Sequence, residues 1–210
     1  MTYVQGTVQS VKNRQRLPAT IQFRPLGKSD RAATSVTASQ DGYYLICLPA
    51  GERYAVLIDY PGYSFYSQSF DLNDTLAFHP YQLDVQLFPL ESRQIEEDQH
   101  IVLNNILFAS GSAELLFEST FELEKVRLFL NEHPKLRIRI EGHTDNVGKP
   151  EENRLLSEKR ALSVVNWLIT NGIAAERMQH VGFGESKPLV ENTSREQRQM
   201  NRRTELVILP

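Results

Sequence analysis

The sequence predicts two domains of different fold class, an N-terminal all-β antiparallel sandwich and a C-terminal α+β domain. The first 90 residues contain all eight tyrosines, but only 7 of the 23 basic and 7 of the 26 acidic side chains. The hydrophobic period also changes, from two residues in the first half to alternating strand and helix periods in the second. A chain of 210 residues is long enough for two small domains. We therefore expect domains at residues 1–90 and 100–210, joined by a linker at 91–99.

Apolar residues alternate with other residues in five short runs of the first half, which is the period of a strand with one buried face. Turn residues separate the runs, and about seven short strands at this spacing are typical of a small sandwich. The runs are Val4, Gly6, Val8; Ile21, Phe23; Tyr44, Ile46, Leu48; Tyr54, Val56, Ile58; and Leu83, Val85, Leu87.

Two dipeptides, Asp41-Gly42 and Pro61-Gly62, predict chain reversals between these strands. Cys47 lies between Ile46 and Leu48 in one of the runs, so we expect it to be a small core residue. As the only cysteine, it excludes an intramolecular disulfide and a zinc site built on cysteines.

The second half begins with a predicted strand at 100–108, in which Asn104-Asn105 is a possible interruption. Leu123, Val126 and Leu130 recur at helical spacing before Pro134 ends the helix.

A one-sided strand follows at 136–141, where isoleucines alternate with Arg139 and Glu141 and the charged face is expected to be wet. The apolar stripe of Ala161, Val164 and Leu168 predicts an amphipathic helix that ends at Asn171-Gly172. A strand at 178–183, a polar helix at 194–201 and a closing strand at 204–209 complete the domain. The order is a βαβαβ core with an added helix and a closing strand.

The charge balance and the apolar runs exclude several classes of protein. A net charge of −3 offers no field that would attract nucleic acid, and no apolar run approaches the roughly 18 residues that span a bilayer.

One segment has the residue types of a binding site. Asp145 follows the strand at 136–141, while Asn153 and Arg160 share a face of the next helix, about 10 Å apart at roughly 1.5 Å per residue. A guanidinium pairs with a carboxylate and Asp145 with an ammonium, so the matching ligand is a zwitterionic amino-acid head. On spacing alone, a plain ion pair between Asp145 and Arg160 is the alternative.

Separated motifs between residues 100 and 209 resemble, in order and spacing, the OmpA C-terminal, peptidoglycan-binding domain family. The resemblance covers about 110 residues, and several motifs in register are more specific than any one of them. The motifs are Ile106 to Ser112, Gly142-His143-Thr144-Asp145, Asn153 with Leu156-Ser157 and Arg160-Ala161, Gly182-Phe183-Gly184-Glu185 before Pro188, and Asn201-Arg202-Arg203.

The resemblance implies non-covalent binding of the diaminopimelate in the wall's stem peptide. By position, Asp145 corresponds to the ammonium partner, Arg160 to the carboxylate partner and Asn153 to another groove position. Thr144, Leu156 and Arg202 match further motif positions. Bracing of the last strand by Arg202 and Arg203 is an equal alternative.

The first half more loosely resembles carboxypeptidase regulatory-like, transthyretin-like sandwiches. Such modules are spacers or interaction domains, and this one is an expected contact to an outer-membrane or envelope protein. Stacking of a saccharide on its tyrosines is an alternative. The shared motifs are Gly6-Thr7-Val8, Asp41-Gly42-Tyr43-Tyr44, Leu48-Pro49-Ala50-Gly51, Tyr54 and Pro61-Gly62-Tyr63.

The sequence thus predicts a periplasmic, outer-membrane-associated wall-binding protein that is not an enzyme and needs no cofactor. The chain begins without a signal peptide or lipid-attachment cysteine, so we expect it to be trimmed from a longer export precursor. One alternative is an assembly module whose groove binds a protein partner. A remote one is a metal-dependent hydrolase, in which His143 and Asp145 would join His133 or His180.

Overall fold

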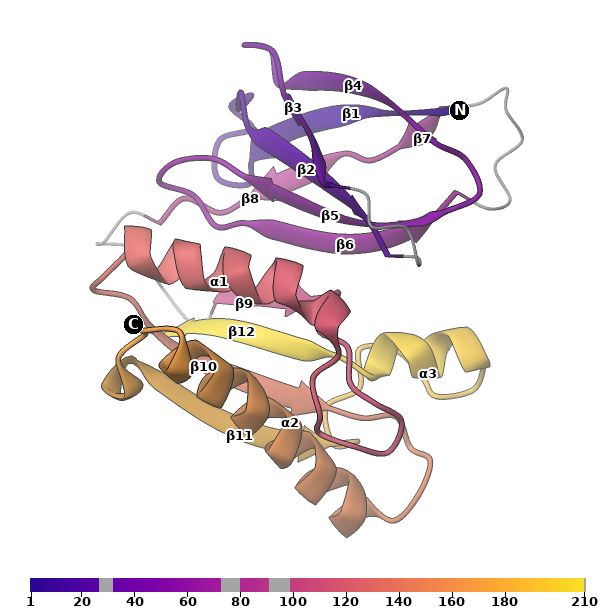
Figure 1. Ribbon diagram of the computed structural model, residues 1–210, viewed down its shortest axis with the longest axis vertical. Helices are drawn as coiled ribbons and strands as arrows, with labels where there is room; N and C mark the ends of the chain where they lie inside the picture. Colours follow the sequence, from indigo (N-terminus) through magenta and orange to yellow (C-terminus); the bar gives the residue numbers. More distant parts are fainter. Residues whose placement is uncertain (27–31, 73–79, 91–98, 210) are drawn as a thin grey trace. The chain divides into compact units, whose positions relative to one another are not determined.

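The computed structural model describes residues 1–26, 32–72, 80–90 and 99–209. Contacts divide the chain into two compact units, Met1–Gln94 and Ile95–Pro210 (Figure 1). Of the predicted linker at 91–99, only Gln99 lies within the described residues, and it begins the first strand of the second unit. The predicted domain limits themselves stay a prediction.

The described part of the first unit consists of strands in two sheets. One sheet has the order β4-β1-β7, with β8 also paired to β1, and the other has the order β3-β2-β5-β6. The strands are β1 (Thr2–Ser10), β2 (Thr20–Pro25), β3 (Thr34–Thr37), β4 (Tyr43–Leu48), β5 (Arg53–Asp59), β6 (Tyr66–Asp71), β7 (Tyr81–Gln82) and β8 (Val85–Leu87).

Both sheets contribute side chains to one hydrophobic core. Val4 and Val8 of β1 and Ile21 and Phe23 of β2 are fully buried, as the two-residue period predicts. Tyr44 also enters this core, where its hydroxyl donates to the carbonyl of Leu83 at 2.8 Å.

Two expectations for this unit are wrong. Pairing is not antiparallel throughout, because β7 and β8 both run parallel to β1. Cys47 is exposed rather than in the core. Tyr44 and Leu48 point inward at even positions of β4, so the two-residue period turns Cys47 outward.

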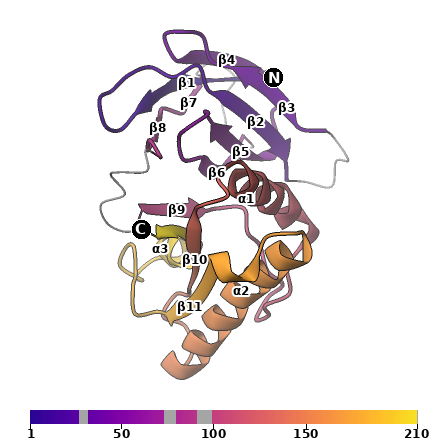
Figure 2. The ribbon, with the colours of Figure 1, turned by 90° about the vertical axis from the view of Figure 1, so that its left-hand side faces the viewer.

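In the second unit, a sheet of order β11-β10-β12-β9 carries α1 and α2 side by side on one face (Figure 2). Strands β10 and β11 are parallel and joined by α2, whereas β12 runs antiparallel to both β10 and β9. The elements are β9 (Gln99–Leu103), η1 (Phe117–Ser119), α1 (Thr120–Glu132), β10 (Arg137–His143), α2 (Pro150–Thr170), η2 (Ala175–Arg177), β11 (Met178–Gly184), α3 (Arg195–Asn201) and β12 (Thr204–Leu209). The predicted order of strands and helices is therefore confirmed, and the second unit is a mixed α and β domain.

Local sequence sets where these elements end. Pro150 opens α2 at its first turn, and Gly172 ends it at a φ of 94°. Strand β9 ends at Leu103, earlier than the predicted residue 108. The reason is Asn105, whose backbone N–H donates at 2.5 Å to Glu122 of α1 instead of to a neighbouring strand.

Among the described residues, no helix combines the length and the hydropathy needed to cross a membrane.

Candidate functional site

Helix α2 approaches the sheet closely because glycines lie beneath it. A Cβ at Gly142 of β10 would lie 2.2 Å from the carbonyl oxygen of Ser157, and one at Gly182 of β11 would lie 2.2 Å from the backbone nitrogen of Glu158. Neither position tolerates a side chain without a shift of the helix. The glycines thus fix the distance between α2 and the end of β10.

Backbone hydrogen bonds hold the loop after β10 at its start. The N–H of His143 donates to the carbonyl of Arg203 at 3.0 Å, and that of Thr144 donates to Gly184 at 2.9 Å. The Asp145 carboxylate then accepts from the N–H of Val147 at 3.0 Å. Asp145 is only 7% exposed, so its charge must be compensated locally.

Arg202 supplies that compensation. Its guanidinium donates to the second carboxylate oxygen of Asp145 and, through another nitrogen, to Gln199 of α3. The pairing joins the loop after β10 to the segment before β12. Local residue patterns give no signal for this pairing, because the two residues are 57 positions apart in the sequence.

Asn153 ties α2 to the same loop. Its side-chain N–H groups donate to the carbonyls of Asp145 and Val147 at 3.3 and 3.1 Å, and to the Glu185 carboxylate at 2.7 Å. Asn153 is only 7% exposed, so its amide is fixed by these neighbours and in turn holds the loop in place.

Arg160 lies half-buried on α2 beside a pocket of about 300 Å³. Its Nε donates to the carbonyl of Ser112 at 2.9 Å, and its guanidinium carbon lies 5.0 Å from the centre of the Phe108 ring. Burial lowers the pKa of Arg160, the cation of Arg202 lowers it further, and Asp145 opposes both. The pocket is lined by Ile106, Leu107, Phe108, Ser110, Gly111, Arg160, Gln199 and Arg202.

The wall of this pocket is anchored to the start of α1. The hydroxyl of Ser119 donates to the carbonyl of Leu107 at 2.9 Å and accepts from its N–H at 2.8 Å. These contacts explain why the segment after β9 leaves the sheet and lies against the helix.

The structure brings most of the predicted site residues together. Asp145, Asn153 and Arg202 share direct contacts, and Arg160 lines the same pocket as Arg202. Thr144 is buried, and its hydroxyl donates to the carbonyl of Asp145 at 2.9 Å. Leu156 is half-buried on α2, about one turn before Arg160.

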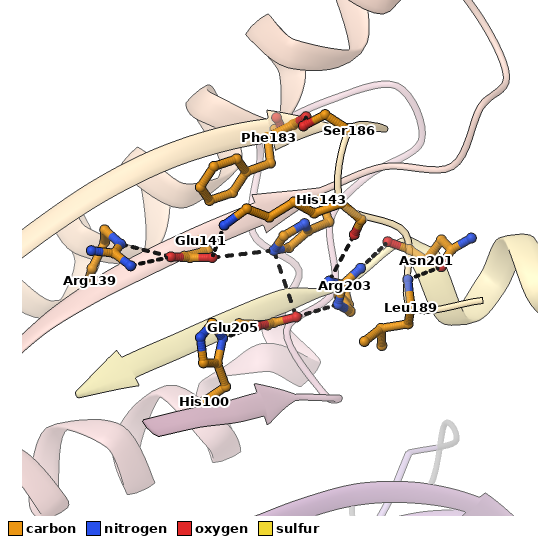
Figure 3. Close-up of polar contacts among 12 residues, drawn as sticks. His100, Arg139, Glu141, His143, Phe183, Ser186, Leu189, Asn201, Arg203 and Glu205 are labelled. Atoms are coloured by element: carbon orange, nitrogen blue, oxygen red, sulfur yellow. Dashed lines mark hydrogen bonds and ion pairs between the residues drawn. The ribbon is translucent and has the colours of Figure 1, made fainter. Parts of the chain in front are cut away.

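A second cluster of charged groups lies on the sheet face at the same end of β10 (Figure 3). Glu141 is fully buried, so the expectation of a wet face is wrong at this position. Arg139 donates to it at 2.7 Å, while Nε2 of His143 lies 3.9 Å from Glu141 and 3.8 Å from Glu205. Burial lowers the pKa of His143 to about 4, and the Arg203 cation contributes in the same direction.

Metal-ligand side chains also meet in this cluster, but its charges are already compensated. Within the described ranges, His100, Glu141 and Glu205 lie close enough to share an ion, whereas the predicted combination with His133 or His180 does not occur. Each carboxylate already accepts from a guanidinium, Glu141 from Arg139 and Glu205 from that of Arg203 at 2.5 Å. Further cationic charge is not favoured there.

Comparison with known proteins identifies the second unit. Residues 107–202 match the OmpA family. A protein of Escherichia coli described as a probable lipoprotein, YiaD, is 34% identical over 140 residues, which cover 62% of this chain and 64% of that protein. The peptidoglycan-binding protein ArfA of Mycobacterium tuberculosis is 35% identical over 103 residues, which cover 49% of this chain and 32% of ArfA.

Among solved structures, the peptidoglycan-associated lipoprotein from Burkholderia pseudomallei is 30% identical, with a TM-score of 0.47 over 50% of this chain and 88% of that chain. The chain spans less than two thirds of the length of YiaD and about a third of ArfA. By the family match, residues 107–202 form an OmpA-like domain.

Proposed function

We propose that the OmpA-like domain binds peptidoglycan non-covalently, through the zwitterionic diaminopimelate head of a stem peptide. The observation that carries the proposal is the charge of the site. Two guanidiniums, Arg160 and Arg202, line one pocket, and they share the charge of one described carboxylate, Asp145, which is hydrogen-bonded to Arg202 and acts on Arg160 electrostatically. The excess positive charge at a half-buried position favours a ligand carboxylate.

Arg160 is the proposed partner of that carboxylate. Its Nε is held by Ser112 and its planar group packs near Phe108, which orients the terminal nitrogens before a ligand arrives. A preoriented guanidinium loses less side-chain entropy when it forms two parallel hydrogen bonds.

Asp145 is the proposed partner of the ligand ammonium. One of its oxygens accepts from Val147 and the other from Arg202. A ligand ammonium at this carboxylate would share it with Arg202, whose guanidinium then gains freedom to approach the ligand carboxylate. Thr144 and Asn153 hold the loop, and Leu156 contributes an apolar surface beside it.

The relatives support this assignment. ArfA, whose name describes peptidoglycan binding, aligns over 103 residues, and the family match includes Asp145, Arg160 and Arg202. We place the protein in the periplasm at the outer membrane, as a binding protein without catalytic activity. The first unit serves as a spacer or interaction module of the carboxypeptidase regulatory-like kind.

Calorimetric titration tests the proposal. The full chain is titrated with a stem peptide that contains diaminopimelate and with its lysine equivalent, which lacks the side-chain carboxylate. We expect selective binding of the first, lost in Arg160→Ala and in Asp145→Asn. Arg154→Ala, an exposed arginine on the same helix, is the matched control and should bind normally.

Two results would contradict the assignment. An Arg160→Ala chain that unfolds would make Arg160 a structural residue, and an amidated diaminopimelate that binds with unchanged affinity would remove its carboxylate role. If neither peptide binds, the second candidate function is favoured, in which the groove binds a protein partner.

A further inference from the structure

The strands of the sheet formed by β1, β4, β7 and β8 carry uncharged side chains, and the carboxylate at the outward face comes from Asp84, between β7 and β8. None of these four strands contains a lysine, arginine, aspartate or glutamate. We call its outward side chains the glutamine face: Tyr3, Gln5, Thr7, Gln9, Tyr43, Leu45, Cys47, Gln82 and Gln86. The other sheet of the unit, in contrast, carries Arg24, Arg53 and Asp59 in its strands.

Two tyrosines lie on this face and are open to solvent. Tyr3 is 55% exposed and Tyr43 is 41% exposed, with Leu45, 46% exposed, beside them. In the register of β1 and β4, Tyr43 lies opposite Thr7, four residues along the strand from Tyr3. The two rings therefore stand at positions about 14 Å apart on a flat sheet, at roughly 3.3 Å per residue and 4.8 Å between strands.

A chain of hydrogen bonds orients the polar groups of the face. The Tyr43 hydroxyl donates to Gln5 at 3.1 Å, and the Gln5 amide donates to Gln82 at 3.3 Å. Gln82 in turn donates at 3.0 Å to Asp84, which also accepts from the hydroxyl of Thr7 at 2.8 Å. The amides are thereby held in fixed orientations across three strands, although each is accessible to solvent.

We propose that the glutamine face binds an extended, uncharged glycan chain. Pyranose rings present C–H groups that pack on an aromatic ring, and their hydroxyl and acetamido groups both donate and accept hydrogen bonds, as glutamine amides do. The glutamine amides match a neutral polymer, whereas an anionic polymer would meet no cation on these strands and would approach the carboxylate of Asp84. The flat shape suits a chain of several sugars rather than one enclosed ring.

This inference does not depend on the stem-peptide site, because it concerns the first unit alone. Its test uses the full chain labelled with nitrogen-15 and three soluble probes: a β-1,4-linked tetramer of N-acetylglucosamine, a tetramer of glucose, and a tetramer of galacturonic acid. We expect a neutral tetramer to shift backbone amide resonances of β1, β4 and β7. The anionic tetramer should shift none of them.

The variants separate stacking from folding. Tyr3→Ala combined with Tyr43→Ala should weaken binding about tenfold, since two stacking surfaces are lost. Tyr3→Phe combined with Tyr43→Phe keeps both rings and should retain most of the affinity. Phe117→Ala, an exposed aromatic of the second unit, is the matched control.

Several outcomes would overturn the proposal. They are the absence of shifts with either neutral tetramer, shifts confined to other strands, and unchanged affinity in the double alanine variant. A concentration-dependent dimer that the same variant abolishes would make the face a contact between copies of this chain. Asp145→Asn should leave the tetramer bound, so failure of the stem-peptide site is distinguishable from failure of this one.

Discussion

The Asp145 carboxylate is nearly buried, and the guanidinium of Arg202 is its directly hydrogen-bonded charge partner. Removing the arginine leaves a desolvated carboxylate, whereas removing both charges does not. We predict that Arg202→Met lowers the free energy of unfolding by about 1–3 kcal/mol. In Asp145→Asn combined with Arg202→Met, the loss should be smaller than the sum of the single losses. Urea denaturation of the four proteins measures the coupling, and strict additivity would show that the pair contributes nothing.

His143 links the stability of the second unit to pH. Its ring is 2% exposed and faces Glu141, Glu205, Arg203 and Lys187, with His100 acting from β9. Burial is the largest cause of its low pKa, about 4 against 6.5 for the free side chain. The unfolded chain therefore binds a proton first as the pH falls.

Stability from His143 is thus present above pH 6.5 and is lost as the pH falls from about 6.5 towards 4. The loss approaches about 3 kcal/mol at the lower limit. Glu205, whose pKa is also lowered, adds a loss in the same direction below its unfolded value of 4.5. Urea denaturation at several pH values between 7.5 and 5 measures how the free energy of unfolding depends on pH. This dependence should be weaker in His143→Gln than in the parent chain or in His133→Gln. An equal dependence in all three would contradict the prediction.

At the scale of the elements, the two-residue and helical periods predicted which segments form strands and helices in the second unit. They did not predict which strands pair with one another. The parallel pairing of β7 and β8 with β1 depends on contacts more than 70 residues apart, and no local pattern encodes it. Glu141 was predicted to be wet because the alternation only marks which face of the sheet it is on. It does not show that Arg139 of the same strand pairs with Glu141, or that Lys187 from the segment after β11 approaches it. The residues of the candidate site were found by motif, but the link between Asp145 and Arg202 was not.

The approach of α2 to the sheet gives a prediction at this scale. A methyl group at Gly142 would clash with the backbone of Ser157, on the side of α2 that faces the sheet. Gly142→Ala should lower the free energy of unfolding by about 2–3 kcal/mol through overpacking, and it should weaken stem-peptide binding because Arg160 moves with α2. Gly172→Ala is the control: its Cβ meets no atom within 4 Å, so only the positive φ of 94° opposes it, at about 1 kcal/mol. Similar losses in both variants would refute close packing as the cause.

At the scale of the whole molecule, each of the two units has its own sheets and its own buried residues. The first encloses a core of aliphatic and tyrosine side chains between two sheets, and the second buries one face of its sheet under α1 and α2. Each of the three sheets in the described residues consists of strands from one unit only, so neither core depends on a strand of the other unit. A unit that completes its own core should fold by itself.

We therefore predict that a fragment of residues 95–210 folds alone and binds the diaminopimelate stem peptide with the affinity of the full chain. Among the described residues, the contacts that orient Asp145, Arg160 and Arg202 come from within this unit, from Phe108 to Arg203. Far-ultraviolet circular dichroism should show a cooperative thermal transition, and calorimetry should give a Kd within about twofold of that of the full chain. A fragment that folds but binds much more weakly would mean that the first unit contributes to the stem-peptide site. A fragment that does not fold would refute the independence of the two units, because its sheet would then need residues before 95.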